Sequence, residues 1–264
     1  MKNLLIYDFR RLLKTKLVKM MAICMVAIPL LVSLFFLGIG FGNNVETNVF
    51  MNGYKMVTFI YGLFNYGIYI MVIILIILMS SEYHNRTIRN KIVAGYSRIK
   101  VYFSGLISIV SICFSIFLVA LLLNFIVCLS IDGSGEIIDL KNYILKHLVG
   151  ITYIIFLIVL CYFLVSTFKS IGAPLGITMA CCIGLVSILM LVDTMVLVMP
   201  ESSAKTAETI LMFFPQHHCN KISAFIDPRE IKNSSLAIFL IIDIVYIILM
   251  VLGGAYKYNK SDFR

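Results

Sequence analysis

Three consecutive residues in the last third of the chain carry metal-binding side chains: His217, His218 and Cys219. Imidazole nitrogen and thiolate sulfur are common ligands of zinc and copper. Neighbouring side chains on one segment cannot all converge on a single ion unless other residues complete the coordination sphere. We therefore interpret this triplet as part of a polar loop at the membrane surface, and we predict no metal site in the chain.

The sequence motifs of several common enzyme classes are absent. The chain contains no G-x-x-x-x-G-K-[ST] segment, so it has no P-loop for ATP. It also lacks the His-Glu-x-x-His zinc motif and the Gly-x-Ser-x-Gly nucleophile elbow. We predict no catalytic residue and no cofactor-binding residue in this chain.

The composition indicates a chain that is solvated largely by lipid. Of the 264 residues, 61% are hydrophobic and 13% are charged, and the mean hydropathy is +1.01. Soluble domains contain about 45–50% apolar and about 25% charged residues. Six of the seven cysteines fall in apolar runs and there is no C-x-x-C, so we interpret them as small buried thiols.

Six segments are long and apolar enough to cross a hydrocarbon core of about 30 Å, which takes about 20 helical residues. The predicted fold is an all-α polytopic membrane protein forming a single transmembrane domain over residues 1–264. The predicted spans are Met20–Phe41, Val57–Met79, Val101–Ser130, His147–Phe168, Gly172–Val198 and Leu236–Tyr256.

Basic residues predict the orientation of these spans. The N-terminal segment, the connection after span two, Lys169 and the C-terminal tail hold 15 of the 22 Lys and Arg residues. Loops rich in Lys and Arg stay on the cytoplasmic side. We expect both termini in the cytoplasm and the protein in the cell membrane. The net charge of +9 then reflects contact with anionic lipid rather than with nucleic acid.

The first 19 residues have the pattern of an amphipathic helix lying in the membrane interface. Its predicted apolar face carries Leu5, Phe9, Leu12 and Leu13, and its polar face carries Asp8, Arg10, Arg11 and Lys14. The alternative is a basic flank that only sets the orientation of span one.

The basic connection between spans two and three predicts a short helix. Thr87 can cap its start, Ile88, Ile92 and Val93 form its apolar side, and Gly95 can end it in a left-handed turn. Such a helix suits the transmission of force from a soluble partner better than it suits catalysis. The alternative is a loop that only fixes orientation.

The segment 199–235 is longer than a turn between two spans requires. Ala204, Ala207, Ile210, Leu211 and Phe214 recur at helical spacing, and Pro215 and Pro228 follow. We predict one or two short helices, re-entrant or interfacial, with a mobile outer loop as the alternative.

Polar residues inside the spans are candidates for a translocation path or for helix interfaces: Asp193, Asp243 and Asn65. A carboxylate in the membrane costs a few kcal/mol unless it is paired or hydrated.

The whole pattern resembles the membrane subunit of ABC type-2 exporters, small six-span type. The resemblance is most specific at Glu82–Arg98, although Asn85-Arg86 stands here where that family frequently has glycine. It implies that the stretch Thr87–Arg98 is a coupling helix seated on a separate ATP-binding subunit. The residues it assigns to that interface are Glu82, Thr87, Ile88, Arg89, Lys91, Ile92, Gly95 and Arg98.

The resemblance also implies an assembly of two permease chains, identical or related, with two ATPase chains that hold the ATP and Mg²⁺. It implies export of a peptide, an antibiotic or a lipid-like substrate. The rival functions are a secondary carrier, a membrane immunity or structural protein without transport, and, as the weakest, a membrane-embedded enzyme.

Overall fold

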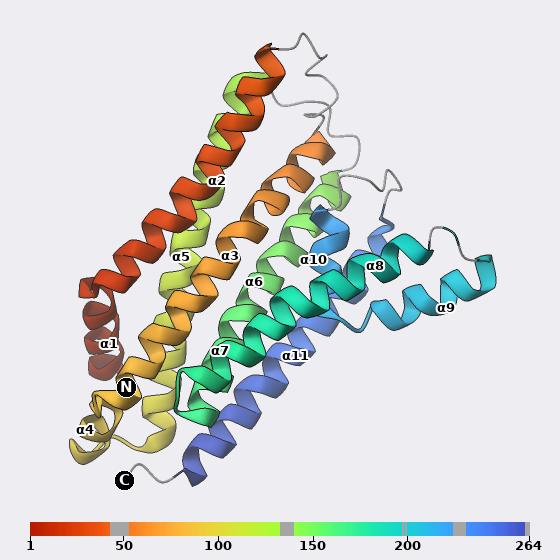
Figure 1. Cartoon of the computed structure of the whole chain (residues 1–264). Coiled ribbons are helices and arrows are strands. Elements are labelled where there is room, and N and C mark those ends of the chain that lie inside the picture. Colours follow the sequence, from red (N-terminus) through yellow and green to blue (C-terminus); the bar gives the residue numbers. More distant parts are fainter. Residues whose placement is uncertain (43–52, 133–139, 197, 199, 224–230, 262–264) are drawn as a thin grey trace.

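The computed structural model is a bundle of long helices (Figure 1). It describes residues 1–42, 53–132, 140–196, 198, 200–223 and 231–261. The elements in chain order are α1 (Lys2–Lys14), α2 (Lys16–Gly42), α3 (Gly53–His84), α4 (Thr87–Val93), α5 (Arg98–Asp132), α6 (Leu140–Phe168), α7 (Gly172–Met179), η2 (Ala180–Leu185), α8 (Val186–Val196), α9 (Glu201–Leu211), α10 (Pro215–Ser223) and α11 (Asn233–Lys260).

The six predicted spans correspond to α2, α3, α5, α6, the run α7–η2–α8, and α11. Four of these, from α5 onward, are long and apolar enough to cross a membrane over the residues whose side chains are described. The helices α2 and α3 contain 27 and 32 residues, which gives each a length of at least about 40 Å. The chain is therefore an all-α polytopic membrane protein. Figure 1 shows α1, α4 and the C-terminal end of α11 together at one end of the bundle.

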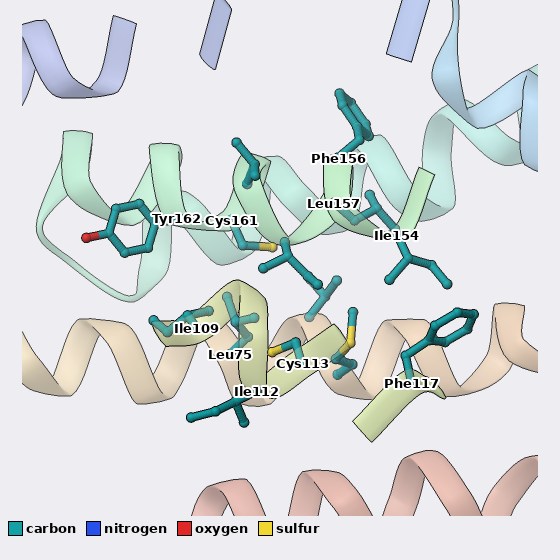
Figure 2. Close-up of a cluster of buried hydrophobic side chains, with 14 of the residues drawn as sticks. Leu75, Ile109, Ile112, Cys113, Phe117, Ile154, Phe156, Leu157, Cys161 and Tyr162 are labelled. Carbon is teal, nitrogen blue, oxygen red and sulfur yellow. The ribbon is translucent and has the colours of Figure 1, made fainter. Parts of the chain in front are cut away.

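Helix α6 is the central element of the bundle. In its most apolar stretch 67% of the residues are buried, against 17% in α11. Leu157 and Cys161 of α6 meet Leu75 of α3 and Cys113 of α5 in the core cluster of Figure 2. The outer faces of α8 and α11 expose large apolar side chains, as a lipid-facing helix does. Helix α6 thus provides the fixed framework against which the polar residues are positioned.

The fifth span is not a uniform α-helix. Between α7 and α8 the backbone widens into the π-helical segment η2. Such segments leave part of the regular backbone ladder unmade and are frequent at functional sites. The hydroxyl of Tyr69 on α3 donates to the backbone oxygen of Cys182, at 3.3 Å, and so ties this widened turn to α3.

The long segment before α11 contains two helices, which confirms the predicted short helices for residues 201–223. Helix α9 packs on α8 through Leu211, Leu189 and Val196. Helix α10 starts at Pro215 and lies against α3, α6, α8 and α11. The polar triplet His217-His218-Cys219 is therefore buried in the bundle and not in a surface loop. Pro228 lies outside the described residues.

The N-terminal helix forms as predicted, but one residue lies on the other face. Leu4, Asp8 and Leu12 make the buried stripe of α1, and Asp8 is only 1% exposed. The prediction that placed Asp8 with the exposed basic residues was wrong. The spacing of residues 4, 8 and 12 puts all three on one helical face, and the buried carboxylate is tolerated because it has a cationic partner, described below.

Candidate functional site

The short helix α4 is formed by two backbone turns that bracket it. Arg86 precedes the helix in the left-handed conformation, with φ of 54°, and Gly95 follows it with φ of 91°. Thr87 is the first helical residue and does not cap the start through its side chain, contrary to the prediction. Arg86 therefore holds the left-handed conformation that glycine adopts most readily, and Gly95 ends the helix as predicted.

The two sides of α4 face different surroundings. Ile88 and Lys91 are each 6% exposed and point into the bundle, where Ile92 also packs on the core. Arg89, Asn90 and Val93 lie on the outer side, and Val93 is 78% exposed. Of the residues assigned to a coupling interface, Arg89 and Gly95 are exposed, whereas Thr87 and Arg98 are partly buried.

The buried side of α4 is held by charge pairs. Nζ of Lys91 lies 2.6 Å from Oδ1 of Asp8 on α1 and 3.6 Å from Oε2 of Glu82 at the end of α3. Arg11 of α1 pairs with Glu82 and lies 4.0 Å from Asp8. We call Asp8, Arg11, Glu82 and Lys91 the four-charge cluster. Its two acids and two bases balance.

The four-charge cluster also reaches α5, because the hydroxyl of Ser104 donates to Oδ2 of Asp8 at 2.7 Å. Each buried charge thus has a counter-charge or a hydrogen-bond donor, which a charge removed from water requires. The cluster joins α1, the end of α3, α4 and α5. A displacement of α4 must therefore carry α1 with it or break buried ion pairs.

Sequence reasoning missed Asp8 and Arg11 as partners of the coupling segment. They lie more than 70 residues away from Glu82 along the chain, so no local spacing reveals the pairing. The available signal was the one acidic residue in an otherwise basic N-terminal segment, placed four residues from both Leu4 and Leu12.

A tyrosine cluster lies next to these charges and connects them to α11. The rings of Tyr162 and Tyr258 lie 5.1 Å and 5.3 Å from that of Tyr102, and the Tyr162 hydroxyl donates to the Tyr102 backbone oxygen at 2.8 Å. Gly105 and Gly254 make room for these rings, since a Cβ at position 105 would lie 2.6 Å from the Tyr162 hydroxyl. Helices α5, α6 and α11 can approach closely here because both positions are glycine.

The predicted polar residues of the spans have different placements. Asp243 is fully buried at the interface of α11 with α6 and α10, where its Oδ1 lies 2.9 Å from Nδ1 of His218. Asp193 lies in α8 and Asn65 in α3, but both side chains are outside the described set. Asp243 is therefore a helix-interface residue. Within the described ranges, no three His, Cys, Asp or Glu side chains are grouped to hold a metal ion.

Comparison with known proteins places this chain in a family of transporters. A family model described as ABC-2 family transporter protein matches residues 10–187, which include the end of α1, all of α2 to α6 and the fifth predicted span through η2. No curated protein matches the chain. The family model covers about two thirds of the sequence, and the chain belongs to the ABC-2 transporter family as a membrane permease subunit.

Proposed function

We propose that this chain is the permease of an ATP-driven exporter and that a separate ATP-binding subunit docks on the exposed side of α4. The observation that carries the proposal is the two-sided character of α4. Its outer side presents Arg89, Asn90 and Val93, while its inner side is fixed to three other elements through Lys91 and Ile88. A force applied to the outer side is passed to the bundle through buried contacts.

The residues predicted for the ATPase interface then divide into two roles. Arg89 and Gly95 are docking residues, and the partly buried Thr87 and Arg98 flank them. Glu82, Ile88, Lys91 and Ile92 are positioning residues that hold α4 against α1, α3 and the core. Arg98 also donates to the backbone oxygen of Asn259, at 3.0 Å, which connects the start of α5 to α11.

The working assembly has two permease chains, identical or related, and two ATPase chains that bind ATP and Mg²⁺. Closure of the ATPase pair moves α4 and opens a path between two copies of α3 and the α7–η2–α8 span, where Asn65 and Asp193 lie. The shift between conformations is limited by the difference in the partner's affinity for them. The cargo is a peptide, an antibiotic or a lipid-like molecule.

Charge reversal on the exposed side of α4 tests the docking role. The chain is co-expressed with a candidate ABC ATPase subunit, and both are purified in lipid nanodiscs. Arg89→Glu should reduce co-purification of the ATPase subunit and its permease-stimulated ATP hydrolysis about tenfold, a change of about 1.4 kcal/mol in binding. Membrane insertion should be unchanged, because Arg89 is exposed.

Lys205→Glu is the matched control, since it makes the same charge change on an exposed residue of α9. Equal binding and equal ATPase stimulation in both variants would refute docking on α4. Alanine at Arg89, Asn90 and Val93 together is a second probe. It spares Ile88 and Ile92, whose replacement would also disturb the core.

Orientation is tested separately by labelling Val93→Cys in a variant lacking the native cysteines. We expect a membrane-impermeant maleimide to label it in inverted vesicles and not in intact cells, because α4 belongs on the cytoplasmic side with both termini. Labelling in intact cells would place α4 on the exterior, where no ATPase can reach it.

A further inference from the structure

The buried environment of His218 requires an explanation that transport does not supply. His218 and Asp243 are both fully buried, on α10 and α11, and Asp243 lies about 15 Å along α11 from its first residue. An ionisable group at such a depth in a span is expensive unless it is neutralised. The ring of His218 also stacks on Phe239, with ring centres 4.2 Å apart, so it cannot rotate freely.

Both ring nitrogens of His218 face oxygen atoms. Nδ1 lies 2.9 Å from Oδ1 of Asp243, and Nε2 lies 2.8 Å from the backbone oxygen of Met212. A backbone oxygen and an ionised carboxylate can only accept hydrogen bonds, and a neutral imidazole has only one N–H. A neutral histidine beside an ionised aspartate would therefore leave two lone pairs facing each other at one of these contacts.

One additional proton satisfies every contact. It resides on Nδ1, which gives an imidazolium paired with a carboxylate, or on Asp243, whose hydroxyl then donates to Nδ1 while Nε2–H donates to Met212. In both arrangements the pair has no net charge, which the low-dielectric surroundings favour. Thr152 of α6 places its hydroxyl 3.5 Å from the second oxygen of Asp243.

We propose that His218 and Asp243 form a proton-binding site that fastens α10 between α6 and α11. Loss of the proton leaves one net negative charge in a fully buried site and sets a ring-nitrogen lone pair against either the carboxylate of Asp243 or the backbone oxygen of Met212. The polar contacts that hold His218 are weaker in either case, whereas the hydrogen bond from Tyr153 to Gln216 continues to connect α10 to α6. The seating of α10 is thus linked to pH, stable at low pH and weakened as pH rises.

Other titratable groups lie on the elements that pack around α10. They include Tyr69 on α3, Lys146, His147 and Tyr153 on α6, His217, Cys219 and Lys221 on α10 itself, and Tyr246 on α11. Asp193 on α8 lies outside the described side chains. Among the described residues, Asp243 is the titratable group whose oxygen lies within hydrogen-bond distance of a His218 nitrogen.

Solid-state NMR of the full chain labelled with ¹⁵N-histidine, in lipid bilayers at pH 7, tests the proton directly. Only four histidines contribute, and His218→Gln, with His217→Gln as the neighbouring control, assigns the signals. If the His218 variant does not fold, variants of the other three assign its signals by elimination. We expect either two protonated His218 nitrogens or, in infrared spectra, a protonated carboxyl band that Asp243→Asn removes. One unprotonated nitrogen together with no such band would overturn the proposal.

Thermal unfolding between pH 6 and pH 9 tests the link to α10, and it also separates proton binding from a merely structural contact. The wild-type midpoint should fall by about 2–4 °C more than that of the His218→Gln/Asp243→Asn double variant, whose amide pair does not titrate. A structural contact alone would lower the midpoint of the variant equally at every pH. Parallel pH profiles for the two proteins would show that α10 is not fastened by a proton.

Discussion

Two polar clusters, near opposite ends of the helix bundle, neutralise their charge in different ways. The four-charge cluster uses two formal ion pairs, and its Arg11 and Glu82 side chains keep 23% and 13% exposure. The His218–Asp243 pair has no exposure and, in our proposal, relies on one shared proton. Where water reaches part of a cluster, separate charges are tolerated because they stay partly hydrated. Deeper in the bundle, a neutral pair costs less than two separated ions.

The largest effect should follow from breaking the four-charge cluster. Lys91→Met leaves the carboxylate of Asp8 buried, with the more distant Arg11 as its cationic partner among the described residues. We expect a loss of about 3–5 kcal/mol in the free energy of unfolding, measured by chemical denaturation in detergent micelles. Arg89→Met on the exposed side of α4 should change it by less than about 0.5 kcal/mol. Equal losses would show that the cluster does not hold α4.

A second prediction concerns α11, the helix that contacts both ends of the bundle. A Cβ at position 254 would overlap the hydroxyl of Tyr102, whereas one at position 253 meets Phe163 at an ordinary 3.8 Å. Gly254→Ala should therefore destabilise the protein by about 1–3 kcal/mol. Gly253→Ala should be neutral or slightly stabilising, since alanine favours helix. If the two substitutions have the same effect in thermal unfolding, the packing of α11 on Tyr102 is not close.

A smaller effect should come from the hydroxyl that assists the deeper pair. Thr152→Val removes the 3.5 Å contact with Asp243 and a hydrogen bond to the backbone of its own helix. We expect a loss of about 0.5–1.5 kcal/mol in unfolding free energy. Thr209→Val loses the same kind of backbone bond on the exposed α9 and is the matched control. A larger loss at Thr209 would contradict a role for Thr152 beside Asp243.

The smallest effect should appear at Arg86. Glycine removes the steric cost of the left-handed conformation, which is about 1–2 kcal/mol for a residue with a Cβ. It also raises the conformational entropy of the unfolded chain, which lowers stability by about 0.4–1 kcal/mol. Arg86→Gly should therefore stabilise the protein by only about 0.5 kcal/mol, close to the limit of a careful denaturation measurement. Arg86→Val, which places a β-branched side chain in the same conformation, should destabilise it. A stabilising valine would show that the turn before α4 is not left-handed.

Much of this fold follows from hydropathy, because lipid imposes a minimum length on each span. The positions of α5 and α11 are within three or four residues of prediction, and α9 was visible as helical spacing. The exceptions share one cause. Asp8, Lys91 and His218 are polar residues whose burial depends on a partner on another helix, and a single sequence does not show which helices meet. Helix α6 begins seven residues earlier than predicted. Its first turns contain two polar residues, Asn142 and Lys146, which the bundle buries, so hydropathy alone did not assign them to the span.

The widened turn η2 has a mechanical consequence for the fifth span. A helix owes its bending stiffness to an unbroken ladder of backbone hydrogen bonds, and a π-helical segment interrupts that ladder. Compliance is therefore concentrated at Ala180–Leu185, between α7, which packs on α3 and α6, and α8, which carries α9. A load applied through α9 would bend the span at this joint and leave the seating of α7 undisturbed.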